Sequence, residues 1–141
     1  MNYSHTNEIF KNCENLGDKI IVKSDLHKIV EHLKNNYNFD ILKEIIALDN
    51  NDGSFELIYN FYSTADEEKL LLSFNTKDAI AESIADLYDS ATMDEKEIFD
   101  LFGINFLGHN DLKRLYMPES WNGHPLRKDY TNNDMRLNWN D

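Results

Sequence analysis

A strictly alternating stretch at residues 55–62 constrains the fold of this chain more than any other feature. Large apolar side chains fill every second position: Phe55, Leu57, Tyr59 and Phe61. The positions between them mix polar and apolar residues. Because successive side chains of a β-strand point to opposite faces, the pattern predicts a strand with one face in a core and the other only partly solvated. Such a strand needs a sheet around it.

Three further stretches supply the other strands of this sheet. Residues 41–48 and 70–74 are rich in Ile and Leu, and short connections at 49–54 and 63–69 join them to the central strand. Short connections make consecutive strands antiparallel neighbours. Residues 19–23, KIIVK, form a β-branched run that predicts one more strand.

Two helices are predicted to cover the sheet. Ser24 can cap a helix whose apolar stripe recurs at helical spacing: Leu26, Ile29, Val30, Leu33 and Tyr37. Residues 76–88 show a second amphipathic pattern, with these side chains inward: Ala79, Ile80, Ser83, Ile84, Leu87 and Tyr88.

A third helix is predicted from Met93 to residue 102. Thr92 and Glu95 have the spacing of a capping box, and Gly103 supplies the left-handed residue that ends many helices. The expected apolar face carries Met93, Ile98, Leu101 and Phe102. The expected solvated face carries Asp94, Glu95, Lys96, Glu97 and Asp100.

The sequence therefore predicts one α+β domain with the element order β-α-β-β-β-α-α. An antiparallel sheet has helices on one face, and an extended irregular tail follows. We expect a polar N-terminal arm at residues 1–18, the domain at 19–106 and a docking tail at 107–141.

The charge of the chain is unevenly distributed. Its 141 residues carry a net charge of −12, all of it within residues 1–100, and the three arginines lie in the neutral remainder. An acidic body argues against nucleic acid and against an anionic membrane surface. No apolar run reaches the roughly 18–20 residues of a membrane span, and no signal-peptide pattern opens the chain. The single cysteine, Cys13, excludes an internal disulfide and a four-thiolate iron–sulfur site.

Residues 121–130, WNGHPLRKDY, have neither helical nor strand periodicity. They nevertheless combine aromatic, basic and acidic side chains, which a purely connecting loop does not need. Arginine and aromatic residues in a neutral segment are typical of protein interfaces. Trp139 is a further candidate anchor, for a partner or for its own domain.

The stretch 92–130 resembles the 30 kDa subunit of respiratory complex I and the equivalent subunit of membrane-bound energy-converting nickel–iron hydrogenases. The matching residues are Glu95-Lys-Glu97, Asp100-Leu-Phe-Gly-Ile104, Phe106, Gly108-His109, Asp111-Leu112, Arg114 and Gly123-His-Pro-Leu-Arg-Lys-Asp129. Lys96 and Lys113 stand where the family usually has arginine.

The resemblance implies a non-catalytic peripheral subunit of NADH–quinone oxidoreductase, held on the cytoplasmic side of the membrane. It implies two partners, the large subunit related to the hydrogenase catalytic subunit and an iron–sulfur subunit, in a complex that couples electron transfer to ion translocation. We expect no cofactor in this chain. Iron–sulfur clusters, with flavin or nickel–iron, belong to the partners.

The resemblance also assigns a docking role to twelve residues: Glu95, Glu97, Asp100, His109, Arg114, Trp121, His124, Pro125, Arg127, Lys128, Asp129 and Tyr130. Charged members would form ion pairs inside the motif or with a partner. The alternative for residues 123–130 is a structural loop with Leu126 in the core.

Three other functions remain open. The chain ends soon after Tyr130, which favours a minimal, hydrogenase-like complex over the longer complex I versions. A free-standing binding module of unknown ligand is the alternative from another class. An independent enzyme or metal site using His109 or His124 has the least support, because neither histidine has a Cys or His partner at ligand spacing.

Overall fold

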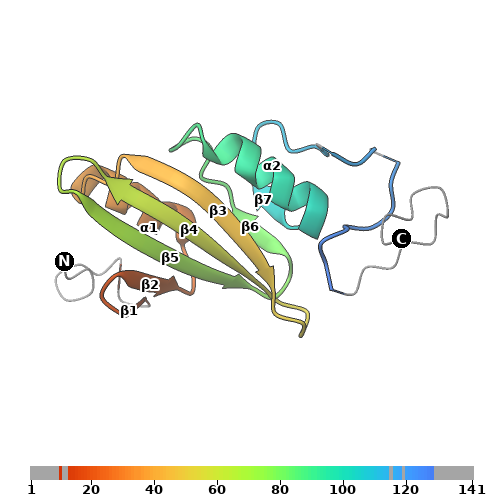
Figure 1. Cartoon of the computed structure of the whole chain (residues 1–141), viewed down its shortest axis with the longest axis horizontal. Coiled ribbons are helices and arrows are strands. Elements are labelled where there is room, and N and C mark those ends of the chain that lie inside the picture. Colours follow the sequence, from red (N-terminus) through yellow and green to blue (C-terminus); the bar gives the residue numbers. More distant parts are fainter. Residues whose placement is uncertain (1–9, 11–12, 115, 119, 129–141) are drawn as a thin grey trace.

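The structure, a computed structural model, describes residue 10 and residues 13–114, 116–118 and 120–128. Its elements are, in chain order, β1 (Glu14–Asn15), β2 (Lys19–Val22), α1 (Leu26–Asn36), β3 (Ile41–Asp49), β4 (Phe55–Ser63), β5 (Glu68–Thr76), β6 (Ile80–Glu82), α2 (Ala91–Phe102) and β7 (Asn105–Leu107). A five-stranded sheet has the order β1-β2-β5-β4-β3, and β6 pairs with β7 separately (Figure 1). The predicted α+β, single-domain fold is confirmed.

The four predicted strands are all present, as β2, β3, β4 and β5. In β4 every second residue from Phe55 to Ser63 is buried, which places one face of the sheet in the core. β3, β4 and β5 are antiparallel neighbours, as predicted. β2 instead runs parallel to β5, so the sheet is mixed, and the short strand β1 extends it at one edge.

Both helices contribute to one core on this face of the sheet. The apolar stripe of α1 is buried as predicted, through Leu26, Ile29, Val30 and Leu33. Ile98 of α2 joins the same cluster. The predicted Ser24 cap is wrong, because α1 begins at Leu26 after Asp25 in a left-handed conformation (φ 57°), with no side-chain cap bond.

The predicted helix at residues 76–88 is wrong. The Thr76 hydroxyl accepts a hydrogen bond from the Ile80 N–H and donates one to the Ile80 carbonyl, and Ala79 has φ 59°. This turn directs residues 80–82 into the strand β6, which runs parallel to β7. Turns follow, and the segment reaches α2 without a second helical element. The observed order therefore has strand β6 where a helix was expected.

The predicted capping box of α2 is also wrong, although the helix itself is present. α2 begins at Ala91, with Ser90 at the N-cap, and no side-chain bond closes this end. The Glu95 carboxylate turns toward another segment. The other end of the helix is as predicted, with Gly103 left-handed at φ 77° and its N–H bonded to the Phe99 carbonyl at 2.9 Å.

Candidate partner interface

Three charged side chains of α2 are buried instead of solvated. Glu95 and Asp100 are fully buried and Lys96 is 8% exposed, whereas Met93, expected on the apolar face, is 53% exposed. The helix therefore turns these three charged residues toward its own domain, whereas Glu97 stays exposed. A buried charge needs a partner of opposite charge or several hydrogen bonds. Each of the three has such partners.

Asp100 is paired with an arginine of the adjoining segment. Arg114 Nε donates to Asp100 Oδ1 at 2.6 Å, and the two side chains are 10% and 0% exposed. The other carboxylate oxygen, Oδ2, accepts the backbone N–H groups of Tyr116 and Met117. The Asp100 carboxylate thus fixes both the Arg114 guanidinium and the backbone at residues 116 and 117.

The Arg114 guanidinium also binds the backbone of residues 121–123. It donates to the carbonyls of Trp121 at 2.7 Å, Gly123 at 2.8 Å and Asp100 at 2.9 Å. Carbonyls at fixed positions around a planar guanidinium set the path of the backbone that bears them. Arg114 therefore holds the motif segment against the end of α2.

His124 packs into the same junction. Its Nδ1 lies 2.9 Å from the Asp100 carbonyl, and its ring lies so close to Gly103 that a Cβ there would be 2.5 Å from the His124 Cδ2 atom. Burial lowers the pKa of His124, and the neighbouring charges of Arg114 and Arg127 act in the same direction. Gly103 thus ends the helix and also makes room for the motif histidine.

Residues 126–128 continue along the outside of the domain. The Leu126 N–H donates to the Leu101 carbonyl at 2.8 Å, and the Lys128 N–H donates to the Asp49 carboxylate at 2.8 Å. The Arg127 guanidinium lies over the Phe55 ring, 5.1 Å from its centroid, and Nε donates to the Phe102 carbonyl. Leu126 is 52% exposed, so it does not fill the core as the alternative of a structural loop required.

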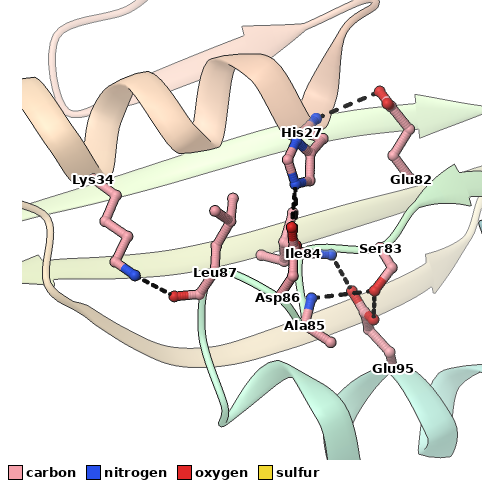
Figure 2. Close-up of polar contacts among 9 residues, drawn as sticks. All are labelled: His27, Lys34, Glu82, Ser83, Ile84, Ala85, Asp86, Leu87 and Glu95. Carbon is pink, nitrogen blue, oxygen red and sulfur yellow. Dashed lines mark hydrogen bonds and ion pairs between the residues drawn. The ribbon is translucent and has the colours of Figure 1, made fainter. Parts of the chain in front are cut away.

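Glu95 holds the segment that follows β6 (Figure 2). Its carboxylate accepts the Ser83 hydroxyl at 2.6 Å and the Ile84 N–H at 2.9 Å. Burial raises the pKa of Glu95, an effect that these two hydrogen bonds oppose. The same segment is fastened to α1, through His27 Nε2 on the Asp86 carboxylate at 2.9 Å and Lys34 Nζ on the Leu87 carbonyl at 2.6 Å. Residues 83–87 are therefore fixed from both helices.

His109 and Lys96 tie the loop after β7 to α2. The His109 side chain is 1% exposed; its Nε2 lies 3.1 Å from the Thr92 carbonyl, and its Nδ1 accepts the Asp111 N–H at 3.0 Å. These two partners place the ring proton on Nε2. Lys96 Nζ pairs with Asp111 at 2.7 Å, a bond that lowers the pKa of Asp111.

The structure thus divides the predicted docking residues into two groups. Four side chains are buried in the network: Glu95, Asp100, His109 and Arg114. Six belong to the outer layer, half-buried or exposed: Glu97, Trp121, His124, Pro125, Arg127 and Lys128. Asp129 and Tyr130, like Trp139, lie outside the described residues.

Sequence reasoning did not assign roles to several members of this network. They are His27, Lys34, Ser83, Asp86 and Asp111. The partners of His27 and Asp111, for example, lie 59 and 15 residues away along the chain. A local sequence pattern therefore cannot predict these contacts. Within the described ranges, no group of three His, Cys, Asp or Glu side chains could hold a metal ion, and no helix has the length and apolarity of a membrane span.

Fold and site together define a class of α+β domain. Two helices contribute to a single core with the buried face of a mostly antiparallel sheet, and a buried arginine fastens the segment after the second helix across its end. The chain belongs to the family of the respiratory-chain NADH dehydrogenase 30 kDa subunit, a peripheral subunit of complex I-like oxidoreductases, and the family model matches residues 20–136. The resemblance seen in the motif is confirmed and extends over most of the chain.

Individual relatives agree with this membership. The C-type subunit of the NADH-quinone oxidoreductase of Trichlorobacter lovleyi is 36% identical over 121 residues, which cover 81% of this chain and 75% of the relative. The C/D-type subunit of the NADH-quinone oxidoreductase of Phocaeicola vulgatus is 31% identical over 119 residues, which cover 82% of this chain and 23% of that longer protein.

Two solved structures share the fold. A trypsin-resistant fragment of Nqo5 has a TM-score of 0.59 and 26% identity, over 70% of this chain and 86% of the fragment. A chain of the membrane-bound sulfane sulfur reductase, an archaeal respiratory membrane complex, has a TM-score of 0.75 over 88% of this chain and 80% of its own length. Its identity is 22%, so this likeness concerns the fold alone.

Proposed function

We propose that this chain is the C-type subunit of an NADH–quinone oxidoreductase and that it holds the large subunit and an iron–sulfur subunit together. One observation carries the large-subunit assignment. In the Phocaeicola vulgatus relative, the part similar to this chain belongs to a single protein whose name joins the C and D types. Two units joined in one chain are neighbours in the assembly they form. The separate chain would take the same place beside its D-type partner.

The geometry supports a division of work within the motif. Asp100 and Arg114 use their charges on each other and on the backbone, so their role is to shape residues 121–128. The outer residues of that segment then meet the partners. We assign docking to Trp121, His124, Pro125, Arg127 and Lys128, with Glu97 on α2, and extend it to Asp129 and Tyr130.

In this proposal the chain's chemistry is positioning. Electron carriers would reside in the partner subunits, as iron–sulfur clusters and flavin, and no residue of this chain would take part in electron transfer. The chain would lie on the cytoplasmic side of the membrane as a peripheral subunit. Its acidic body would face water, and the neutral segment with the arginines would face the partners.

Affinity purification of the tagged chain from gently solubilised membranes tests this function. Mass spectrometry should identify a D-type large subunit and an iron–sulfur subunit, and metal analysis should find iron without nickel. Nickel with a four-cysteine large subunit would place the chain in an energy-converting hydrogenase instead. Recovery of the chain alone would contradict the assembly role and leave a free-standing binding module.

A further inference from the structure

A groove of about 370 Å³ runs between β3 and α2. Its apolar lining comes from both elements and from the motif segment, through Ile45, Ile98, Phe102 and Leu126. Ile45 and Ile98 belong to the core, whereas Leu126 is half exposed. The groove thus connects the core of the domain with the surface beside residues 126–128.

One wall of the groove is the edge of the sheet. β3 is the last strand in the order β1-β2-β5-β4-β3, so one row of its peptide groups points away from β4. The Ile45 N–H belongs to this row, because it donates to the Asp94 carboxylate of α2 at 3.2 Å. In an antiparallel ladder the direction alternates, so the peptide groups of Ala47 point the same way. An extended chain in the groove would meet backbone donors and acceptors there.

The charges around the groove have one sign. Glu44, Asp94 and Glu97 line it, and none of its lining residues is basic. Asp94 is half-buried, and burial raises its pKa. Apolar walls with carboxylates at the rim complement a segment that has apolar side chains and a lysine or arginine. They disfavour an acidic segment.

We propose that this groove receives an extended segment of a partner subunit, with apolar side chains against Phe102 and Leu126 and a basic side chain between the carboxylates. This inference rests on the proposed assembly function and deepens it, since it adds a second contact surface. The groove is continuous with the docking segment through Leu126. A partner that contacts residues 126–128 would reach it without crossing the domain.

Site-specific photo-crosslinking in the assembled complex tests the proposal. A photoreactive residue at position 101, whose leucine lines the groove, is compared with one at position 93 on the same helix, outside the lining. Position 101 should crosslink to a peptide of a partner that contains lysine or arginine among apolar residues, and position 93 should not. Glu44→Lys with Glu97→Lys should lower the yield at position 101 by about tenfold or more, because like charges would then meet.

Other crosslinking patterns separate this inference from the function it rests on. If the partners co-purify but position 101 crosslinks to residues 129–141, to a second copy of the chain or to nothing, the groove inference is wrong and the assembly function stands. An unchanged yield after the charge reversal would also overturn it. If the partners do not co-purify, both proposals fail.

Discussion

Asp100 is the residue on which the polar network of the motif converges. It is fully buried, pairs with Arg114 and accepts two backbone N–H groups. Asp100→Asn keeps the size but removes the charge, and it turns an amide toward donors. We expect the free energy of unfolding to fall by about 3 kcal/mol or more, since the Arg114 guanidinium keeps its charge without a counter-charge. Urea denaturation measures the change.

Glu97→Gln is the matched control for this variant. It removes the same charge from the same helix, but Glu97 is exposed and its nearest partner is the Tyr116 hydroxyl at 3.5 Å. Its unfolding midpoint should stay close to that of the natural chain. If both variants lost the same free energy of unfolding, the loss would come from removing a charge from the helix and not from the buried contacts of Asp100.

Tyr59 and Tyr88 offer opposite outcomes for the same substitution. The Tyr59 hydroxyl is buried and bonds to no described residue, whereas the Tyr88 hydroxyl donates to the Phe39 carbonyl at 2.5 Å. Tyr88→Phe should cost about 1 kcal/mol, because it leaves that buried carbonyl without this donor. Tyr59→Phe should keep or raise the free energy of unfolding. A loss at Tyr59 as large as that at Tyr88 would mean that the hydroxyl has a partner.

Glu95 gives the domain a pH dependence with a defined sign. Burial raises its pKa above the ordinary value of 4.5, so the folded chain binds this proton more tightly than the unfolded chain does. The contribution of the protonated Glu95 carboxyl to the free energy of unfolding is fully present below pH 4.5 and is lost as pH rises through the raised pKa. Relative to Glu95→Gln, the natural chain should therefore lose free energy of unfolding from about pH 4.5 upward, as urea midpoints at several pH values would show. A difference that is constant or grows with pH would contradict this.

Gly103 joins the end of α2 to the motif segment. It has φ 77°, and an added Cβ would lie 2.5 Å from His124. Gly53 has φ 91° with no atom within 4 Å of its added Cβ. Gly53→Ala should cost about 1–2 kcal/mol from backbone strain alone, and Gly103→Ala should cost more. Thermal or urea unfolding of both variants measures the excess.

A double variant tells whether this excess comes from His124. In a His124→Ala background the clash is absent, so adding Gly103→Ala should cost about as much as Gly53→Ala does. The coupling between positions 103 and 124 is then the difference between the two backgrounds. If the free energies of unfolding lost in the two single variants simply add up in the double variant, the extra cost of Gly103→Ala does not come from His124.

The elements differ in how far the sequence could reveal them. β4 and α1 have strong periods because each buries one face on a core made by its neighbours, so local pattern and burial agree. Residues 76–88 have a helical period too, but β7 pairs with β6, and Glu95 takes the Ser83 hydroxyl and the Ile84 N–H. Those partners come later in the chain. The local sequence pattern contains no information on these later partners, whose hydrogen bonds replace those of a helix.

The same limit applies to the site. Composition and motif picked out Asp100, Arg114 and residues 123–128, and the structure brings them together at the end of α2. The expected solvated face of α2 was wrong because the partners of Glu95 and Asp100 lie 11 to 17 residues away. A charged side chain on a helix is therefore exposed only where no hydrogen-bond donor from a distant part of the sequence binds it.

The whole molecule has two parts: a core whose buried apolar residues include Phe10 and extend to Phe106, and a segment, residues 121–128, fastened to it by polar contacts. The core cluster of buried apolar residues has no member in residues 121–128. That segment is held instead by the Arg114 bonds to Trp121 and Gly123, the Leu126 bond to Leu101 and the Arg127 contact with Phe55. Loss of the segment should therefore lower stability without abolishing the fold.

Two shortened chains test this separation. One ends at Lys128 and keeps the contacts of residues 121–128; the other ends at Trp121 and loses the Gly123 carbonyl that Arg114 binds, the Leu126 bond and the Arg127 contact. A hydrogen bond to a charged group contributes about 1.5–3 kcal/mol, so the chain ending at Trp121 should unfold with at least about 2 kcal/mol less free energy. Its transition should remain cooperative in urea, because the core is intact, and it should fail to enter the complex. Equal midpoints would mean that residues 122–128 do not stabilise the domain, and entry of the shorter chain into the complex would remove their docking role.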